Sequence, residues 1–204
     1  CSIEKGDIFI DLGSHLGEEL EELVKVGVRV HSFEPHPKLS EILRQRYGDN
    51  PLVVLNEAAA TAGGSDGFET LYYKDHIGDI EDGGSTLSRD KFLVSQGIVP
   101  DYVKTSDFLI HAASNPNKSS RVKAIDIVGY IKKIKEKIKV LKIDVEGTEY
   151  ELLESLLSSG VLKDIDYIYC EDHEDHAFSK NWHEQKRKVS TMLSEKGVEI
   201  KRWF

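Results

Sequence analysis

Short apolar runs alternate with apolar residues at helical spacing through the first quarter of the chain. Three runs, at 7–12, 28–33 and 52–55, predict buried strands. Between them, leucines and other apolar residues recur on one helical face and predict helices over 16–24 and 39–47. Strand, helix, strand, helix, strand is typical of a parallel sheet with right-handed crossovers.

The regular pattern stops at about residue 61 and returns at about residue 120. Clusters of Gly, Ser, Asn and Asp in this stretch are turn and loop chemistry. This stretch predicts one strand, over 68–73, and one short helix, over 89–96. An irregular insertion after the third strand is often a lid or a binding loop, although a plain surface loop would have the same composition.

The remainder of the chain resumes the alternation of strands and helices. Helices are predicted over 127–138, 152–157 and 182–193, and strands over 140–145, 165–170 and 198–203. We therefore expect an α/β fold in a single domain over 1–204, with a mostly parallel central sheet and helices on both faces. The insertion over 61–120 would lie on the substrate side.

Charge and cysteine content narrow the classes of partner. With 36 acidic and 27 basic side chains the net charge is −9, so a phosphate backbone is a poor partner and we expect no nucleic acid. No apolar run approaches the roughly 20 residues that span a bilayer. Two cysteines without a C-x-x-C pair argue against a disulfide framework or a cysteine zinc site and fit a cytoplasmic protein.

The first predicted strand runs into a glycine turn with a carboxylate at its start. Gly13 and Gly17 enclose Ser14 and His15 in a G-x-x-x-G spacing, which lets the backbone approach a ligand at a helix N-terminus. Asp11, two residues before the first glycine, could accept a hydrogen bond from a ligand ammonium. Glycine turns between strand and helix are common, so the loop alone does not define a ligand.

Glu34 ends the second predicted strand, about twenty residues after the loop. An acidic residue at this place binds the ribose hydroxyls of a nucleoside in open α/β sheets. A carboxylate favoured by the dipole of the next helix is the structural alternative. Loop and acid together indicate a nucleoside-containing ligand.

Four motifs resemble the FkbM-type family of S-adenosylmethionine-dependent methyltransferases. They read I-D-L-G-S-H-L-G at 10–17, S-F-E-P at 32–35, N-E-A-A at 56–59 and L-K-I-D-V-E-G-T-E at 141–149. The last is the most specific, because few other families end the fourth strand in D-x-E-G-x-E. The resemblance implies a Rossmann-like class I methyltransferase fold and O-methylation of a small-molecule or carbohydrate acceptor.

The resemblance also implies a set of residues for the cofactor S-adenosyl-L-methionine. The loop would hold its methionine end, Glu34 its ribose, and Glu57 with the Ala58 backbone its adenine. Ser85 would lie over cofactor and substrate, and Asp144 with Glu146 beside the sulfonium. The cofactor-binding residues implied are Asp11, Gly13, Ser14, His15, Gly17, Glu34, Glu57, Ala58, Ser85 and Asp144.

Carboxylates and imidazoles crowd the end of the strand predicted over 165–170. Asp144, Glu171 and Asp172 could together bind Mg²⁺ or Mn²⁺. His173, Asp144 and Glu171 are the predicted catalytic residues, with His173 as the base that takes a proton from the acceptor hydroxyl. A solvated acidic loop is the alternative for this cluster, and His15 is a rival base.

Three other classes of function share parts of this pattern. A nicotinamide-dependent oxidoreductase would share the loop and Glu34, but it would require G-x-G-x-x-G and a catalytic Tyr-x-x-x-Lys or its equivalent. A non-catalytic binding module would keep the fold without turnover. A hydrolase could use the acidic cluster as a metal site without an adenosyl cofactor. The acceptor and the oligomeric state stay open.

Overall fold

A computed structural model describes residues 2–63, 67–73, 87, 118–172 and 182–203 of the chain. Its central sheet has six strands in the order β3-β2-β1-β7-β8-β9, and every neighbouring pair is parallel. The strands are β1 (Ile8–Leu12), β2 (Arg29–Phe33), β3 (Val53–Asn56), β7 (Ile138–Ile143), β8 (Ile165–Cys170) and β9 (Ile200–Arg202). The parallel sheet predicted from the apolar runs is confirmed.

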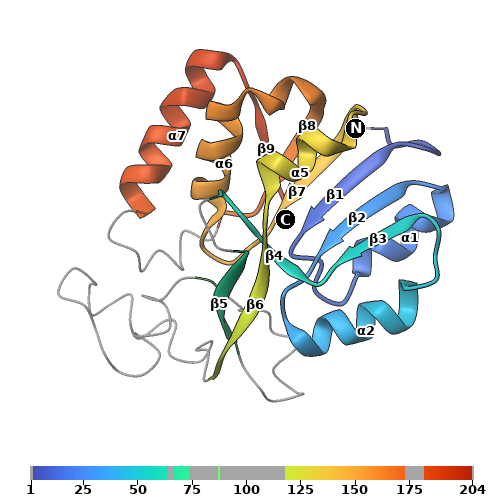
Figure 1. The fold of residues 1–204 in the computed structure, drawn as a ribbon. Helices are drawn as coiled ribbons and strands as arrows, with labels where there is room; N and C mark the ends of the chain where they lie inside the picture. The colour runs from blue at the N-terminus through green and yellow to red at the C-terminus, as the bar shows by residue number, and fades with distance from the viewer. Residues whose placement is uncertain (1, 64–66, 74–86, 88–117, 173–181, 204) are drawn as a thin grey trace.

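Helices cover both faces of this sheet (Figure 1). One face packs against α1 (Glu18–Val26) and α2 (Pro37–Tyr47), which bury Leu20 and Leu43 with apolar residues of β1, β2 and β7. The other face carries the larger core, to which α5 (Ile127–Ile134), α6 (Glu149–Ser159) and α7 (Trp182–Lys196) contribute. A 3₁₀ turn, Val161–Asp164, connects α6 to β8.

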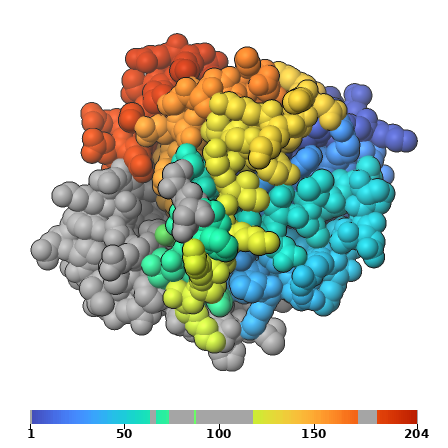
Figure 2. Space-filling view, viewed as in Figure 1, coloured from blue at the N-terminus to red at the C-terminus, as the bar shows by residue number. Residues whose placement is uncertain are grey.

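A second sheet of three strands stands beside the first, in the order β4-β6-β5. It consists of β4 (Ala58–Thr61), β5 (Phe68–Tyr73) and β6 (Lys118–Asp126), with β4 parallel and β5 antiparallel to β6. Figure 2 shows β6 at the surface, in agreement with its mostly exposed side chains. The strand predicted over 68–73 is confirmed, whereas β4 and β6 were not predicted.

Strands β4 and β6 overlap the two ends of the predicted insertion. Thr61 is the last residue of β4, and Lys118–Ser120 open β6, so both ends of the 61–120 stretch belong to a sheet. The helix predicted over 89–96 lies outside the described residues. The other predicted helices and strands are present with ends shifted by a few residues. Among the helices that the structure describes, none has the length and apolar character needed to cross a membrane.

Candidate active site at the carboxyl edge of the sheet

Backbone hydrogen bonds bring the predicted site segments together at one edge of the central sheet. The amides of Gly13 and Ser14 both donate to the Phe33 carbonyl, at 3.0 and 3.1 Å. On the other side of β1, the Asp144 amide donates to the Leu12 carbonyl at 2.9 Å. The Glu171 amide donates to the Ile143 carbonyl at 3.0 Å. The ends of β2, β1, β7 and β8 are therefore adjacent, where ligands bind in open α/β folds.

Gly13 is the point of closest approach between the first loop and the end of β7. Its φ is +88°, and a Cβ atom placed there would lie 1.7 Å from the Asp144 carbonyl oxygen. No other residue fits without moving one of the two segments. Gly17, at φ +76°, ends the loop at the start of α1, and its Cβ would lie 2.7 Å from Leu43.

Two residues of the loop have different surroundings: Ser14 is buried, and His15 is partly exposed. Ser14 is fully buried, accepts a hydrogen bond from the Ser32 hydroxyl at 2.7 Å and donates to the Asp11 carbonyl at 3.3 Å. His15 adopts a left-handed backbone conformation with φ +49° and sends its ring toward Glu18, 3.4 Å away. The backbone amide of His15 donates a hydrogen bond to Glu34, the residue predicted to bind ribose.

Glu34 follows β2 with its carboxylate held in place by two backbone amides. The His36 amide donates to Oε1 at 2.8 Å and the His15 amide donates to Oε2 at 2.9 Å. The side chain is 5% exposed, and this burial raises the pKa of Glu34 to about 7 although both amide hydrogen bonds act against it. Each oxygen can accept a second hydrogen bond, so the fixed carboxylate can bind a pair of hydroxyls.

Asp11 forms an ion pair with a lysine of the same chain, Lys142. The Lys142 ammonium lies 3.2 Å from Asp11 Oδ1, and Asp11 is 0% exposed. The same ammonium lies 3.3 Å from Asp144 Oδ2 and 3.7 Å from Glu19 Oε1. Burial lowers the pKa of Lys142, but these three carboxylates outweigh that effect and the pKa is raised, so the lysine carries its charge.

The acids of the D-x-E-G-x-E motif have different surroundings. Asp144 keeps 23% of its side chain exposed beside Lys142. Glu146 adopts a left-handed conformation with φ +59° in the turn before α6. Glu149 is fully buried, and both of its carboxylate oxygens accept from the Gly147 amide, at 3.0 and 3.1 Å. The last acid therefore stabilises the turn, while Asp144 stays partly exposed at the edge of the sheet.

Glu57 and Ala58 lie where β3 passes into β4. Glu57 is exposed and forms an ion pair with Arg44 of α2 at 3.4 Å, and Arg44 also pairs with Glu41. Ala58 is buried as the first residue of β4. The Glu34 amide donates to the Asn56 carbonyl at 3.0 Å, so this segment lies next to Glu34, the residue predicted to bind ribose. Contact of Glu57 with adenine stays a prediction.

Asp172 is bound by two other side chains of the protein. Tyr150 donates to its Oδ1 at 3.1 Å, and the Lys186 ammonium lies 2.7 Å from its Oδ2. Within the described part of the chain, no group of three or more His, Cys, Asp and Glu side chains could hold a metal ion. His173 and Ser85 lie outside the described residues. The metal site over Asp144, Glu171 and Asp172 has no support in this part of the structure.

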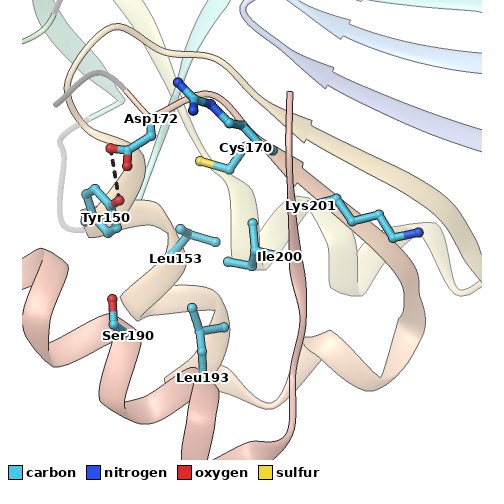
Figure 3. A pocket seen from close by; sticks show the side chains of 9 residues that line it. Tyr150, Leu153, Cys170, Asp172, Ser190, Leu193, Ile200 and Lys201 are labelled. Atoms are coloured by element: carbon cyan, nitrogen blue, oxygen red, sulfur yellow. Dashed lines mark hydrogen bonds between the residues drawn. The ribbon is translucent and has the colours of Figure 1, made fainter. Parts of the chain in front are cut away.

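A pocket of about 360 Å³ opens between the last two strands and the last two helices (Figure 3). Leu153, Leu193 and Ile200 give it an apolar wall, and Tyr150 and Asp172 form a hydrogen-bonded pair at one end. Lys201 points away from the others in this view. The pocket includes Asp172 but neither Asp144 nor Glu171, so the predicted acidic cluster is divided between two places.

Lys142 lies among the predicted site residues but is not among the residues expected from the sequence. It lies in the middle of a motif that was identified, with apolar residues on both sides. A lysine inside a strand predicted to be buried needs a carboxylate partner, because an unpaired buried charge is costly. That signal was present, but the identity of its partners requires the pairing of β1 with β7, in which Asp11 stands opposite Lys142.

The parallel sheet, the glycine loop after β1 and the carboxylate after β2 define a Rossmann-like α/β protein, a fold whose ligands bind at this edge of the sheet. The chain belongs to the FkbM methyltransferase family, because the family model "Methyltransferase FkbM domain" matches residues 11–200. It is therefore a methyltransferase, and the family implies S-adenosylmethionine as cofactor. Searches with the chain found no match among curated proteins and none among solved structures.

Proposed function

We propose that this protein transfers the methyl group of S-adenosylmethionine to a hydroxyl oxygen of a small-molecule or carbohydrate acceptor. The observation that carries the proposal is the Glu34 carboxylate, fixed by the His15 and His36 amides directly beside the glycine loop. A buried carboxylate with one free acceptor position on each oxygen suits the two hydroxyls of a ribose. Membership of the FkbM family supports the reaction class.

The glycine loop and the carboxylates at the sheet edge support the proposal of this cofactor. The loop of Gly13 to Gly17 would hold the methionine end, with Asp144 beside it, and Glu34 would hold the ribose. The segment at Glu57 and Ala58 would border the adenine. The cofactor supplies a methyl group on a sulfonium, which is the electrophile of the reaction.

The protein must then align the acceptor and remove its proton. Methyl transfer is an in-line substitution in which the acceptor oxygen gains the methyl group and the sulfonium becomes a thioether. An alcohol is a weak nucleophile at neutral pH, so a base raises the rate. We propose that Asp144, Glu171 and His173 form the acceptor side, with His173 taking the hydroxyl proton.

The cofactor proposal is tested by thermal unfolding with and without S-adenosylhomocysteine. Ligand at about a hundred times Kd adds roughly 2.7 kcal/mol, which for a chain of this length raises Tm by about 5–10 °C. NAD⁺ should give no shift. Glu34→Ala should abolish the shift, whereas Glu136→Ala, an exposed acid paired with Arg29, should keep it. No shift in the wild type, with cooperative unfolding, would contradict the proposal and favour a non-catalytic binding module.

The acceptor side is tested by transfer of labelled methyl groups to a panel of hydroxylated sugars and small metabolites. Removal of a general base lowers turnover by about 10²–10⁴-fold. His173→Ala should lower kcat by this order while leaving the Kd for S-adenosylhomocysteine unchanged. Intact turnover in this variant would show that another group takes the proton, and His15→Ala would then be the next variant to measure.

A further inference from the structure

We propose that Lys142 is the positioning residue of the cofactor site, because its buried ammonium fixes the first loop against the acidic end of β7. The inference rests on the proposed function in that it takes S-adenosylmethionine as the cofactor. Lys142 itself does not need to touch the cofactor. It sets the place of the two groups that do, the Gly13 backbone and the Asp144 carboxylate.

Three oxygen atoms from two segments converge on the ammonium. Nζ of Lys142 lies 3.2 Å from the Gly13 carbonyl, 3.2 Å from Asp11 Oδ1 and 3.3 Å from Asp144 Oδ2. An ammonium has three N–H donors, so one side chain can serve all three oxygens. The Lys142 side chain is 3% exposed, which shows that water does not compete for these contacts.

The contacts join parts of the chain that are far apart in sequence. Gly13 is 129 residues from Lys142, and its Cα already lies against the Asp144 backbone, where no Cβ fits. Glu19 of α1 adds a fourth contact at 3.7 Å, so the helix that follows the loop is included. Loss of the ammonium would free the Gly13 carbonyl and leave carboxylates of like charge to repel one another.

The same arrangement separates the roles of Asp11 and Asp144. Asp11 is 0% exposed; burial raises the pKa of its carboxyl, and the Lys142 ammonium, 3.2 Å from Oδ1, acts against this effect. Asp144 keeps 23% of its side chain exposed and contacts the same ammonium. We therefore propose that Asp144 binds the ammonium of the ligand. Asp11 instead holds the Lys142 side chain in place from the buried side of the cluster.

The charge of the cluster suits the cofactor. Asp11, Glu19 and Asp144 with Lys142 carry a net charge of −2 when all four are ionised. The methionine end of S-adenosylmethionine has an ammonium, a carboxylate and a sulfonium, and so carries a net positive charge. Lys142 keeps the carboxylates together without cancelling the negative charge that attracts this ligand.

The test compares two ligands that differ only at the methionine end. S-Adenosylhomocysteine has this end, whereas 5′-methylthioadenosine keeps the adenosine and thioether without the amino acid. We expect Lys142→Met to weaken S-adenosylhomocysteine at least tenfold by calorimetry and methylthioadenosine by no more than about threefold. Lys139→Met is the matched control on the same strand, where the ammonium pairs with Asp166 at 3.5 Å. It should leave both affinities within about twofold.

A second variant keeps the test valid if Lys142→Met does not fold. Lys142→Met combined with Asp11→Asn removes one charge of each sign and preserves the net charge of the cluster. It should regain thermal stability and still discriminate against S-adenosylhomocysteine, because the Gly13 carbonyl has lost its donor. Equal losses for both ligands, or no loss for either, would overturn the role of Lys142. Failure of the wild type to bind either ligand would instead contradict the proposed function.

Discussion

Burial of Glu34 makes the stability of the protein depend on pH in an unusual direction. Its pKa is about 7 in the folded protein, compared with an ordinary value of 4.5, because burial penalises the ionised form. The folded state therefore binds a proton more tightly than the unfolded state. This contribution to stability is complete below about pH 4.5 and is lost as pH rises through about 7.

The magnitude follows from the two pKa values. The shift corresponds to about 3 kcal/mol in full, of which about 2.5 kcal/mol is lost between about pH 5 and pH 8. Glu34 is 5% exposed, so solvent screens little of this energy. Urea unfolding of the wild type and of Glu34→Gln at both pH values isolates it, since the other groups titrate alike in the two proteins. Glutamine keeps the size of the side chain but has no carboxylate to titrate.

The expected result is a difference between the two proteins that changes with pH. From about pH 5 to pH 8 the free energy of unfolding of the wild type should fall by about 2.5 kcal/mol relative to Glu34→Gln. Two ribose hydroxyls donate to an ionised carboxylate, so the wild-type affinity for S-adenosylhomocysteine should rise over the same range while that of Glu34→Gln stays level. A constant stability difference across the range would refute the reasoning, because it would mean that Glu34 is already ionised in the folded protein from about pH 5 upward.

Three further predictions concern the loop, the pocket and the metal. Gly13→Ala should lower the free energy of unfolding, measured in urea, by about 3 kcal/mol, and Gly6→Ala by about 1 kcal/mol. Both glycines have φ +88°, but only at Gly13 would the new Cβ collide with a backbone atom, the Asp144 carbonyl oxygen. Equal losses would contradict the close contact between Gly13 and Asp144. Tyr150→Phe should cost about 1 kcal/mol in the same assay by removing the hydrogen bond to Asp172, and an unchanged midpoint would mean that the bond contributes nothing. EDTA should leave Tm unchanged, because Asp172 is already paired with Tyr150 and Lys186. A rise in Tm with Mg²⁺ or Mn²⁺ would instead support the metal site predicted at Asp144, Glu171 and Asp172.

Hydrophobic patterning predicts the central sheet well because its inner strands β1 and β7 are buried on both faces. Runs such as Ile8–Leu12 have few other interpretations, and all five residues of β1 are buried. The second sheet gives no such signal. The β4 strand is three alanines and a threonine, and β6 is mostly polar and exposed, so both resemble loop sequence. Strands β4 and β6 pair with each other although they lie about sixty residues apart in the sequence, and a local pattern carries no information about such a distant partner.

The sequence predicts those residues of the candidate site that directly follow a strand. Glu34 follows β2 as expected, and Gly13 turns the chain where the first run of apolar residues ends. The partner of Asp11 was not predictable, because a carboxylate near the end of a strand can meet a ligand ammonium or a lysine equally well. The register of β1 against β7 decides between them, and it places Lys142 opposite Asp11.

The most direct test of the account is a crystal structure of the protein with S-adenosylhomocysteine bound. We predict that the ribose hydroxyls lie on the Glu34 carboxylate, and that the methionine ammonium lies near Asp144 with the loop of Gly13 to Gly17 around it. Ligand density in the pocket between Tyr150 and Ile200, or density that leaves Glu34 without a contact, would contradict the site described above.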